Sequence, residues 1–386
     1  MTDEIGQAKD LFHRNERLFV SIGVWPLRST YVTFSVWILY LISHMTTLFA
    51  DFYYVFGNTE LMIVNISESS LKIMILPKML VLRFSSRLKR LMQRVIDDVD
   101  ADNWESLKEQ EVYLSYNRVA SSFFTLWFTT ALTTSIIYHL KPLEFRLKSM
   151  FGNESLPFVL PYRTHLFFDV KDSSTFWTVW LLQSPMIWIH MFHTATIAFL
   201  CCLVLHVCGK MAVLTFRIKN LDLDRHEDPG SFRIIFRDIV TRHRDILQLS
   251  KDIEGVFQLL LLEELLISTV IVGLTSYIVI LTIHAEDKGI FIACLTYALS
   301  VLWLLYGYCV AGEYLLTEST NLYNAFYDCQ WYNSSDSFKK QMIICMLSAK
   351  KPVCLTGGGF YVFSLVNYTG ILKTTASYVS MLRKIA

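Results

Sequence analysis

The sequence predicts an all-α membrane protein with seven transmembrane helices, and three observations support this fold class. Hydrophobic residues make up 53% of the 386 residues and charged residues 18%, against about 45–50% and about 25% in soluble domains. The mean hydropathy is +0.39. The apolar residues are gathered into long blocks, which favours a single membrane domain over residues 1–386. A net charge of +1 gives no reason to expect a nucleic-acid partner.

Seven apolar blocks are long enough to cross a hydrocarbon layer about 30 Å thick, which needs about 20 residues per helix. Lys72 and Lys78 weaken the second block, and Asn367 and Lys373 weaken the seventh. Pro185 and Pro77 lie inside spans, and we interpret both as kinks. The seven predicted spans are Tyr31–Ala50, Leu61–Leu82, Val119–Leu140, Thr175–Val207, Val256–Ile283, Gly289–Ala311 and Val353–Leu382.

The sequence predicts neither a cleaved signal peptide nor a disulfide framework. The charged segment from Met1 to Arg28 lacks the apolar core of a signal peptide, so we expect the first span to act as the anchor signal. None of the eight cysteines falls in a predicted outer loop. A disulfide framework is therefore not expected.

The positive charges predict the orientation of the spans. With a cytoplasmic N-terminus, the inner segments hold 24 Lys and Arg residues and the outer segments hold 8. Positive residues concentrate on the cytoplasmic side of membrane proteins, so we expect the N-terminus inside and the C-terminus outside. A G-protein-coupled receptor has the opposite orientation, and this makes it a weak alternative.

Asparagine sequons agree with this orientation. Asn153-Glu154-Ser155 lies in the longest predicted outer loop, and we expect Asn153 to be the glycosylation site. Asn65-Ile66-Ser67 lies at the outer edge of the second span, whereas Asn333 would be cytoplasmic and Asn367 intramembrane.

The segments assigned to the cytoplasm are predicted to be helical. Residues 82–118 and 232–253 alternate apolar and polar side chains with a helical period, so the fifth span is expected to begin well inside the cytoplasm. In residues 312–352, Tyr323, Tyr327 and Trp331 recur every four residues. Such an aromatic stripe must be buried, either between subunits or within the subunit.

Few residues in the spans are candidates for chemistry. His190 and His193 have the spacing of two metal ligands, but no Cys or carboxylate lies near them in that span, and we expect no metal and no cofactor. Glu263 and Glu264 lie in the fifth span, where carboxylates are functional candidates. We expect them to pair with a basic residue of the cytoplasmic helices. No nucleophile–base pair emerges, so an enzyme is not predicted.

The last span carries a polar stripe. Successive spacings of 3, 4, 3 and 4 place Asn367, Gly370, Thr374, Ser377 and Met381 on one helical face. Such a stripe marks either close helix packing or a water-lined path. Lys384 lies beyond it, where a basic side chain would shape the mouth of a pore.

Two helical faces predict a site for small organic molecules. Both combine aromatic rings with a few hydroxyl groups, which suits volatile-sized ligands, although lipid-facing aromatics would give the same pattern. The face of the third span comprises Thr130, Thr134 and Tyr138, and that of the fourth comprises Trp177, Trp180, Ser184 and Trp188.

At its C-terminus the chain resembles the insect odorant receptors. The resemblance rests on Leu322-Tyr323-Asn324-Ala325-Phe326-Tyr327-Asp328-Cys329-Gln330-Trp331-Tyr332, on Ile371-Leu372-Lys373 and on Ser377-Tyr378-x-x-x-Leu382-Arg383. These match the family's Tyr…Cys…Trp helix and its terminal Ser-Tyr-x-x-x-Leu-Arg. The Thr-Tyr…Gln-Phe ending of the related gustatory receptors is absent.

The resemblance implies an odorant-gated, non-selective cation channel subunit in the plasma membrane of a sensory dendrite. Such subunits assemble as a tetramer with a shared co-receptor, with residues 312–352 in the cytoplasmic anchor and residues 353–382 lining the pore. Met381 would lie near the gate and Ser377 one turn inward. The short second cytoplasmic segment resembles that of a tuning subunit rather than the co-receptor.

The ligand is expected among spans two, three, four and six, which adds Ile73, Cys294 and Tyr297 to the predicted ligand-binding residues. Ligand binding would favour an open arrangement in which the last span moves. A transporter using Glu263, Lys72 and Lys373 is the alternative, although no internal repeat supports it.

Overall fold

The computed structural model describes residues 2–100, 104–151, 157–221, 229–282, 289–333 and 336–385. These residues form helices joined by short connections, together with one small hairpin. The elements are α1 (Thr2–Ile22), α2 (Tyr31–Tyr54), α3 (Thr59–Phe84), α4 (Ser86–Asp100), α5 (Leu107–Phe151), α6 (Ser173–Gln183), α7 (Met186–Lys219), α8 (Pro229–Thr282), α9 (Gly289–Asp328), the 3₁₀ turn η1 (Trp331–Asn333), α10 (Asp336–Ala349), β1 (Thr356–Gly357), β2 (Tyr361–Val362) and α11 (Leu365–Ile385).

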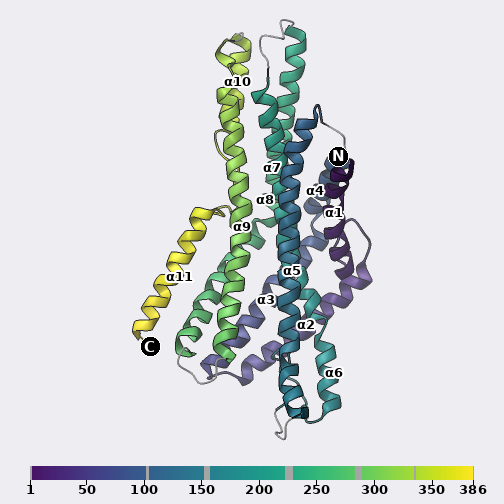
Figure 1. Cartoon of the computed structure of the whole chain (residues 1–386), viewed down its shortest axis with the longest axis vertical. Coiled ribbons are helices and arrows are strands. Elements are labelled where there is room, and N and C mark those ends of the chain that lie inside the picture. Colours follow the sequence, from purple (N-terminus) through teal and green to yellow (C-terminus); the bar gives the residue numbers. More distant parts are fainter. Residues whose placement is uncertain are drawn as a thin grey trace.

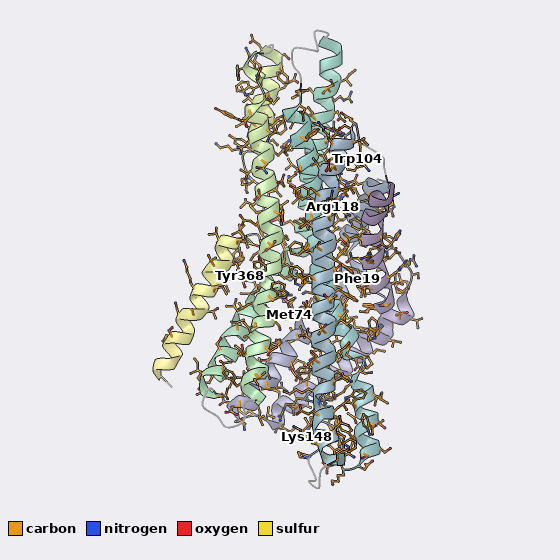
Figure 2. All side chains as sticks on the ribbon, viewed as in Figure 1. Phe19, Met74, Trp104, Arg118, Lys148 and Tyr368 are labelled. Atoms are coloured by element: carbon orange, nitrogen blue, oxygen red, sulfur yellow. The ribbon has the colours of Figure 1, made fainter. Side chains whose placement is uncertain are left out.

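Four long helices, α5, α7, α8 and α9, run along the long axis of the molecule (Figure 1). Helix α7 is buried on every side from Met191 to Gly209 because its residues there are almost all apolar or small. It is the centre of the core, and the side chains of the surrounding helices fill the space around it (Figure 2). Phe19 of α1 is one of these core side chains and packs on Phe192 and Phe199 of α7 (Figure 2).

By length and apolar composition, five stretches of described helix can cross a membrane. The other two predicted spans correspond to α3 and α11, which carry more polar and charged residues than the rest. The five stretches are Tyr31–Tyr54, Leu107–Ser149, Ser173–Lys219, Ile234–Thr282 and Phe291–Asp328.

The prolines behave differently from each other. Helix α3 passes through Pro77 without interruption. At Ser184 and Pro185 the regular helical hydrogen-bond pattern is interrupted, which divides the fourth span into α6 and α7, but both residues keep right-handed helical dihedral angles. Pro185 has no N–H to continue α6, and its carbonyl accepts the first bond of α7 from Trp188 N at 3.0 Å.

The helices extend beyond the predicted spans at the end of the molecule that carries α10. Helix α8 begins at Pro229, 27 residues before the predicted span, which confirms the expected extension. Helix α9 continues to Asp328 and turns through η1 into α10.

Asp98 of α4 lies against Lys210 of α7 and 3.6 Å from His206 Nε2. Burial alone would raise the pKa of this carboxyl, but the two basic partners hold it at about 2.

The predicted last span begins too early. Residues 353–364 are not helical, and helix α11 begins at Leu365 rather than Val353. Gly358 and Gly359 have φ values of +62° and +79° and close the tight turn between β1 and β2. The hydroxyl of Ser364 then caps α11 by accepting the N–H of Asn367 at 3.2 Å. The glycine run of residues 357–359 therefore forms part of an ordered hairpin.

Candidate functional site

Helix α3 is the centre of the region where the predicted ligand-binding residues meet. Tyr138 of α5 donates its hydroxyl hydrogen to Glu68 Oε1 at 2.6 Å. Tyr297 of α9 donates to the carbonyl of Ser67 at 2.8 Å. The two tyrosines thus reach α3 from neighbouring helices at consecutive residues, as the prediction of a shared site requires.

Trp180 joins this region from α6. Its Nε1 donates to the carbonyl of His139 at 3.2 Å, and its ring centroid lies 4.4 Å from the His139 ring. Trp177 packs on Trp180 at 5.7 Å but is 39% exposed. The predicted face of the fourth span therefore contributes mainly Trp180.

Other predicted ligand-binding residues are not brought to the same place. Thr130 and Thr134 are exposed, and their hydroxyls bond to carbonyls of their own helix. Ser184 lies in the turn between α6 and α7, where its hydroxyl donates to the carbonyl of Leu181, and Trp188 is half-exposed. The role of these four residues in ligand binding stays a prediction.

The remaining two predicted residues lie at the edges of α3 and α9. Ile73 is 38% exposed on α3. Cys294 is buried at the start of α9, where it packs with Ile63 and Ile278. Neither residue makes a polar contact with the two tyrosines.

Tyr162, which the sequence did not single out, lies in the middle of the region. It belongs to the connection between α5 and α6 and is 1% exposed. Its backbone is held by Gln183, whose Oε1 accepts from Tyr162 N at 3.3 Å and whose Nε2 donates to Tyr162 O at 3.2 Å. The Tyr138 ring centroid lies 5.6 Å from that of Tyr162. A loop tyrosine gives no periodic signal, and this is why pattern analysis missed it.

A buried ion pair lies deeper in the bundle. Lys78 of α3 contacts Glu264 of α8, and His193 Nε2 of α7 lies 3.5 Å from Glu264 Oε1. The expected partner of Glu264 was a basic residue of the cytoplasmic helices, and that expectation was wrong. An intramembrane lysine is the partner because a buried carboxylate needs its opposite charge within the same low-dielectric region. Among the described residues no group of three or more His, Cys, Asp or Glu could hold a metal ion.

Helix α11 leans away from the bundle (Figure 1). Its inner face packs through Ile371 and Tyr368, whose hydroxyl donates to the carbonyl of Leu302 at 3.2 Å (Figure 2). The predicted stripe lies on its exposed surface at Gly370, Thr374, Ser377 and Met381. Asn367, at the start of the stripe, is half-buried, and its Nδ2 donates to Val362 O at 2.7 Å.

The aromatic stripe of residues 312–352 is divided between inside and outside. Tyr323 and Trp331 pack against the core of the protomer. Tyr327 is 62% exposed, and its carbonyl accepts from Trp331 Nε1 at 3.2 Å. The structure thus buries two of the three within the subunit.

The predicted glycosylation sites and the predicted pore-mouth residue differ in where they lie. Asn153 lies outside the described residues, and so does the side chain of Lys384. Asn65, in the second predicted outer sequon, is 1% exposed and donates to Asp51 Oδ2 at 2.9 Å. Its buried amide is unsuited to carrying a glycan.

Comparison with solved structures identifies the fold. The chain superposes on the insect olfactory receptor OR5 of Machilis hrabei with a TM-score of 0.81, at 13% identity over 99% of this chain and 100% of that one. The complex of the same receptor with eugenol gives a TM-score of 0.78, at 13% identity over the whole of both chains. The all-helical seven-transmembrane fold is therefore confirmed.

Sequence comparison gives the family. Odorant receptor 13a of Drosophila melanogaster is 28% identical over 195 residues, which are 47% of this chain and 46% of that protein. The odorant receptor coreceptor of Aedes aegypti is 28% identical over 144 residues, or 37% of this chain and 30% of that protein. The chain thus aligns with less than half the length of these relatives. The model of the family "7tm Odorant receptor" matches residues 58–376. The chain belongs to this family of multi-pass membrane receptors, which are not enzymes.

Proposed function

We propose that the chain is an odorant-tuning subunit of a ligand-gated, non-selective cation channel. One observation carries the proposal: the polar stripe of α11 is exposed on the protomer from Gly370 to Met381, whereas a neighbouring face of the same helix packs on the bundle through Tyr368 and Ile371. Small and hydroxyl-bearing residues on an exposed face of a membrane helix suit a neighbouring subunit or a water-filled path. In an oligomer with α11 at its axis, Thr374, Ser377 and Met381 would line the pore.

The partner in this proposal is an odorant receptor coreceptor, in a heteromeric tetramer. Exposed apolar side chains on the last turns of α9 and on α10 support an interface at that end, among them Tyr327, Ile344 and Leu347. A coreceptor is among the relatives of this chain. The N-terminus and the α10 end would lie in the cytoplasm and the C-terminus outside the plasma membrane.

A connected path supports gating from α3 to α11. The region of α3 reached by Tyr138 and Tyr297 contacts α8 and α9, and the hairpin before α11 is bonded to α8 through Gly358 N and Gln258 O at 2.9 Å. Leu365 N, the first of α11, donates to Glu313 Oε2 of α9 at 3.0 Å. A ligand that shifts α3 relative to α8 and α9 would therefore move the base of α11.

The test is co-expression with an insect odorant receptor coreceptor in cells that lack both. A panel of volatile organic molecules should evoke a cation current that neither subunit alone reproduces. Ligand-evoked G-protein signalling without current would overturn the proposal in favour of a G-protein-coupled receptor. Accumulation of a substrate in vesicles without current would favour a transporter.

A further inference from the structure

Buried polar atoms without hydrogen-bond partners concentrate around Tyr162. Fourteen such side-chain atoms occur among the described residues, and seven of them belong to four neighbours of Tyr162 and to Tyr162 itself. Buried polar groups are nearly always satisfied by protein, water or ligand, so this concentration is a candidate place for water or a polar ligand. We name the Tyr162 cluster after its centre; its members are His44, Glu68, Lys72, Tyr138, His139, Tyr162 and His190.

The members of the cluster surround one ring. The centroids of the His44, His139 and His190 rings lie 5.7, 6.1 and 5.5 Å from that of Tyr162. Within the ranges that the structure describes, no hydrogen-bond partner is found for either ring nitrogen of His44 and His139, for His190 Nε2 or for the Tyr162 hydroxyl. Four different segments, α2, α5, α7 and the connection before α6, therefore bring groups with unsatisfied polar atoms around the Tyr162 ring.

Two opposite charges of α3 lie in this cluster without forming a direct ion pair. Lys72 is 1% exposed, and its Nζ makes no hydrogen bond or ion pair with any residue that the structure describes. Its contact is with the Tyr162 ring, whose centroid lies 5.4 Å away. Glu68, one turn earlier on the same face, accepts the Tyr138 hydroxyl hydrogen at Oε1, while its buried Oε2 has no hydrogen-bond partner in the described part of the chain. Each charge thus keeps unused hydrogen-bonding capacity, which is costly in a buried site.

The charges of the surrounding elements cancel. Asp51 of α2 pairs with Arg163 at 2.8 Å and accepts a hydrogen bond from Asn65. The charges of the remaining two residues, Glu68 and Lys72, also sum to zero. A ligand with a net charge would add an uncompensated charge to this site, so the site favours a neutral molecule.

The two unsatisfied charged groups, Lys72 Nζ and Glu68 Oε2, determine which functional group of a ligand they can bind. As an ammonium, Lys72 can only donate hydrogen bonds, and as a carboxylate, Glu68 can only accept them at Oε2. A hydroxyl group serves both because it has one O–H donor and two acceptor lone pairs. An ether, ester or ketone oxygen serves only Lys72. The rings of Tyr138, Tyr162 and Trp180 supply apolar walls for the carbon skeleton.

We propose that the Tyr162 cluster binds the hydroxyl group of a neutral alcohol or phenol between Lys72 and Glu68, and that this contact selects hydroxyl-bearing ligands. The inference rests on the proposed function, since it names the class of ligand that opens the channel. Water would satisfy the same atoms, but it would give no preference between an alcohol and its methyl ether.

The experiment compares matched probes on the unmodified chain co-expressed with a coreceptor. The probes are 2-phenylethanol and 1-octanol, their methyl ethers, and the corresponding carboxylic acids and primary amines. Each alcohol should be at least tenfold more potent than its ether, acid and amine. An ether as potent as its alcohol would overturn the inference, and so would a preference for the acid or the amine.

Variants assign the preference to the cluster. Lys72→Met and Glu68→Gln should reduce the potency ratio of alcohol to ether toward one, and Tyr138→Phe should change it less. Leu80→Met, at an exposed position of the same helix, is the matched control and should keep the ratio. A ratio unchanged in all three cluster variants would show that the hydroxyl binds elsewhere. If a variant fails to reach the surface, the ratio measured on the unmodified chain still decides the ligand class.

A binding measurement separates this inference from the proposed function. The thermal stability of the purified complex is recorded with each alcohol and with its ether. Stabilisation by the alcohol alone, without any evoked current, would support the hydroxyl site and contradict the channel. Currents evoked equally by alcohols and ethers, with equal stabilisation, would support the channel and contradict the hydroxyl site.

Discussion

Two side chains, Trp180 and Met381, lie in separate parts of the protein. Trp180 belongs to the predicted ligand-binding region around α3, and Met381 to the exposed surface of α11. Trp180 is half-buried against His139 with its indole N–H bonded, whereas Met381 is 59% exposed near the end of α11. Their surroundings are so different that substitutions at the two positions should have separable effects.

Trp180→Leu should change ligand sensitivity and leave ion permeation unchanged. Loss of the hydrogen bond to His139 O removes about 0.5–1.5 kcal/mol, which corresponds to about a two- to tenfold shift in the half-maximal odorant concentration. Met381→Ala should do the reverse and change relative cation permeability. Dose–response curves and reversal potentials measure the two effects. Leu181→Ala, at an exposed neighbour of Trp180, should change neither; a ligand-sensitivity change in Met381→Ala alone would refute the assignment.

The ion pair between Lys78 and Glu264 should depend on both partners. Lys78→Met leaves a buried carboxylate without its counter-charge and should cost about 3–5 kcal/mol of stability. The double variant Lys78→Met/Glu264→Leu should recover most of that loss. Thermal denaturation of the detergent-solubilised protein, followed by size-exclusion chromatography, measures both. A double variant as unstable as the single one would mean that the pair has a role beyond mutual neutralisation.

At the scale of elements, the sequence predicted helices better than the contacts among them. Apolar blocks located the helices because membrane burial requires long apolar stretches. The hairpin of residues 356–362 was missed because its two-residue strands are too short for a periodic signal. The partner of Glu264 was missed because Lys78 is 186 residues away, and no local pattern records such a contact. Tyr138 and Trp180 could be singled out from the sequence because each shares a helical face with other aromatic or hydroxyl-bearing residues, and their role in ligand binding stays a prediction.

The close approach of the hairpin to α9 should require Gly312. A Cβ at this position would lie 2.1 Å from the backbone oxygen of Phe363, which has no room to move without displacing the start of α11. Gly312→Ala should therefore cost about 1–3 kcal/mol and lower the thermal stability. Gly273→Ala is the matched control, since a Cβ there meets no atom within 4 Å. The control should be at least as stable as the unmodified chain; equal behaviour of the two variants would show that the hairpin is loosely held.

At the scale of the whole molecule, the protomer has a packed bundle around α7 and one helix that is packed on a single face. Helix α11 leans away from the bundle (Figure 1), which it contacts through Tyr368 and Ile371, and its polar stripe from Gly370 to Met381 is exposed. This asymmetry is the structural basis for proposing that the functional unit is an oligomer with α11 at its axis.

Cysteine modification of α11 during an odorant-evoked current tests this claim most directly. The eight native cysteines are buried or half-buried, so the unmodified chain should respond little to a positively charged, water-soluble thiol reagent. In the co-expressed complex, the reagent should reduce the current of Ser377→Cys by more than half and leave that of Ile371→Cys unchanged. Block of Ile371→Cys with no effect on Ser377→Cys would contradict a pore lined by the polar stripe of α11.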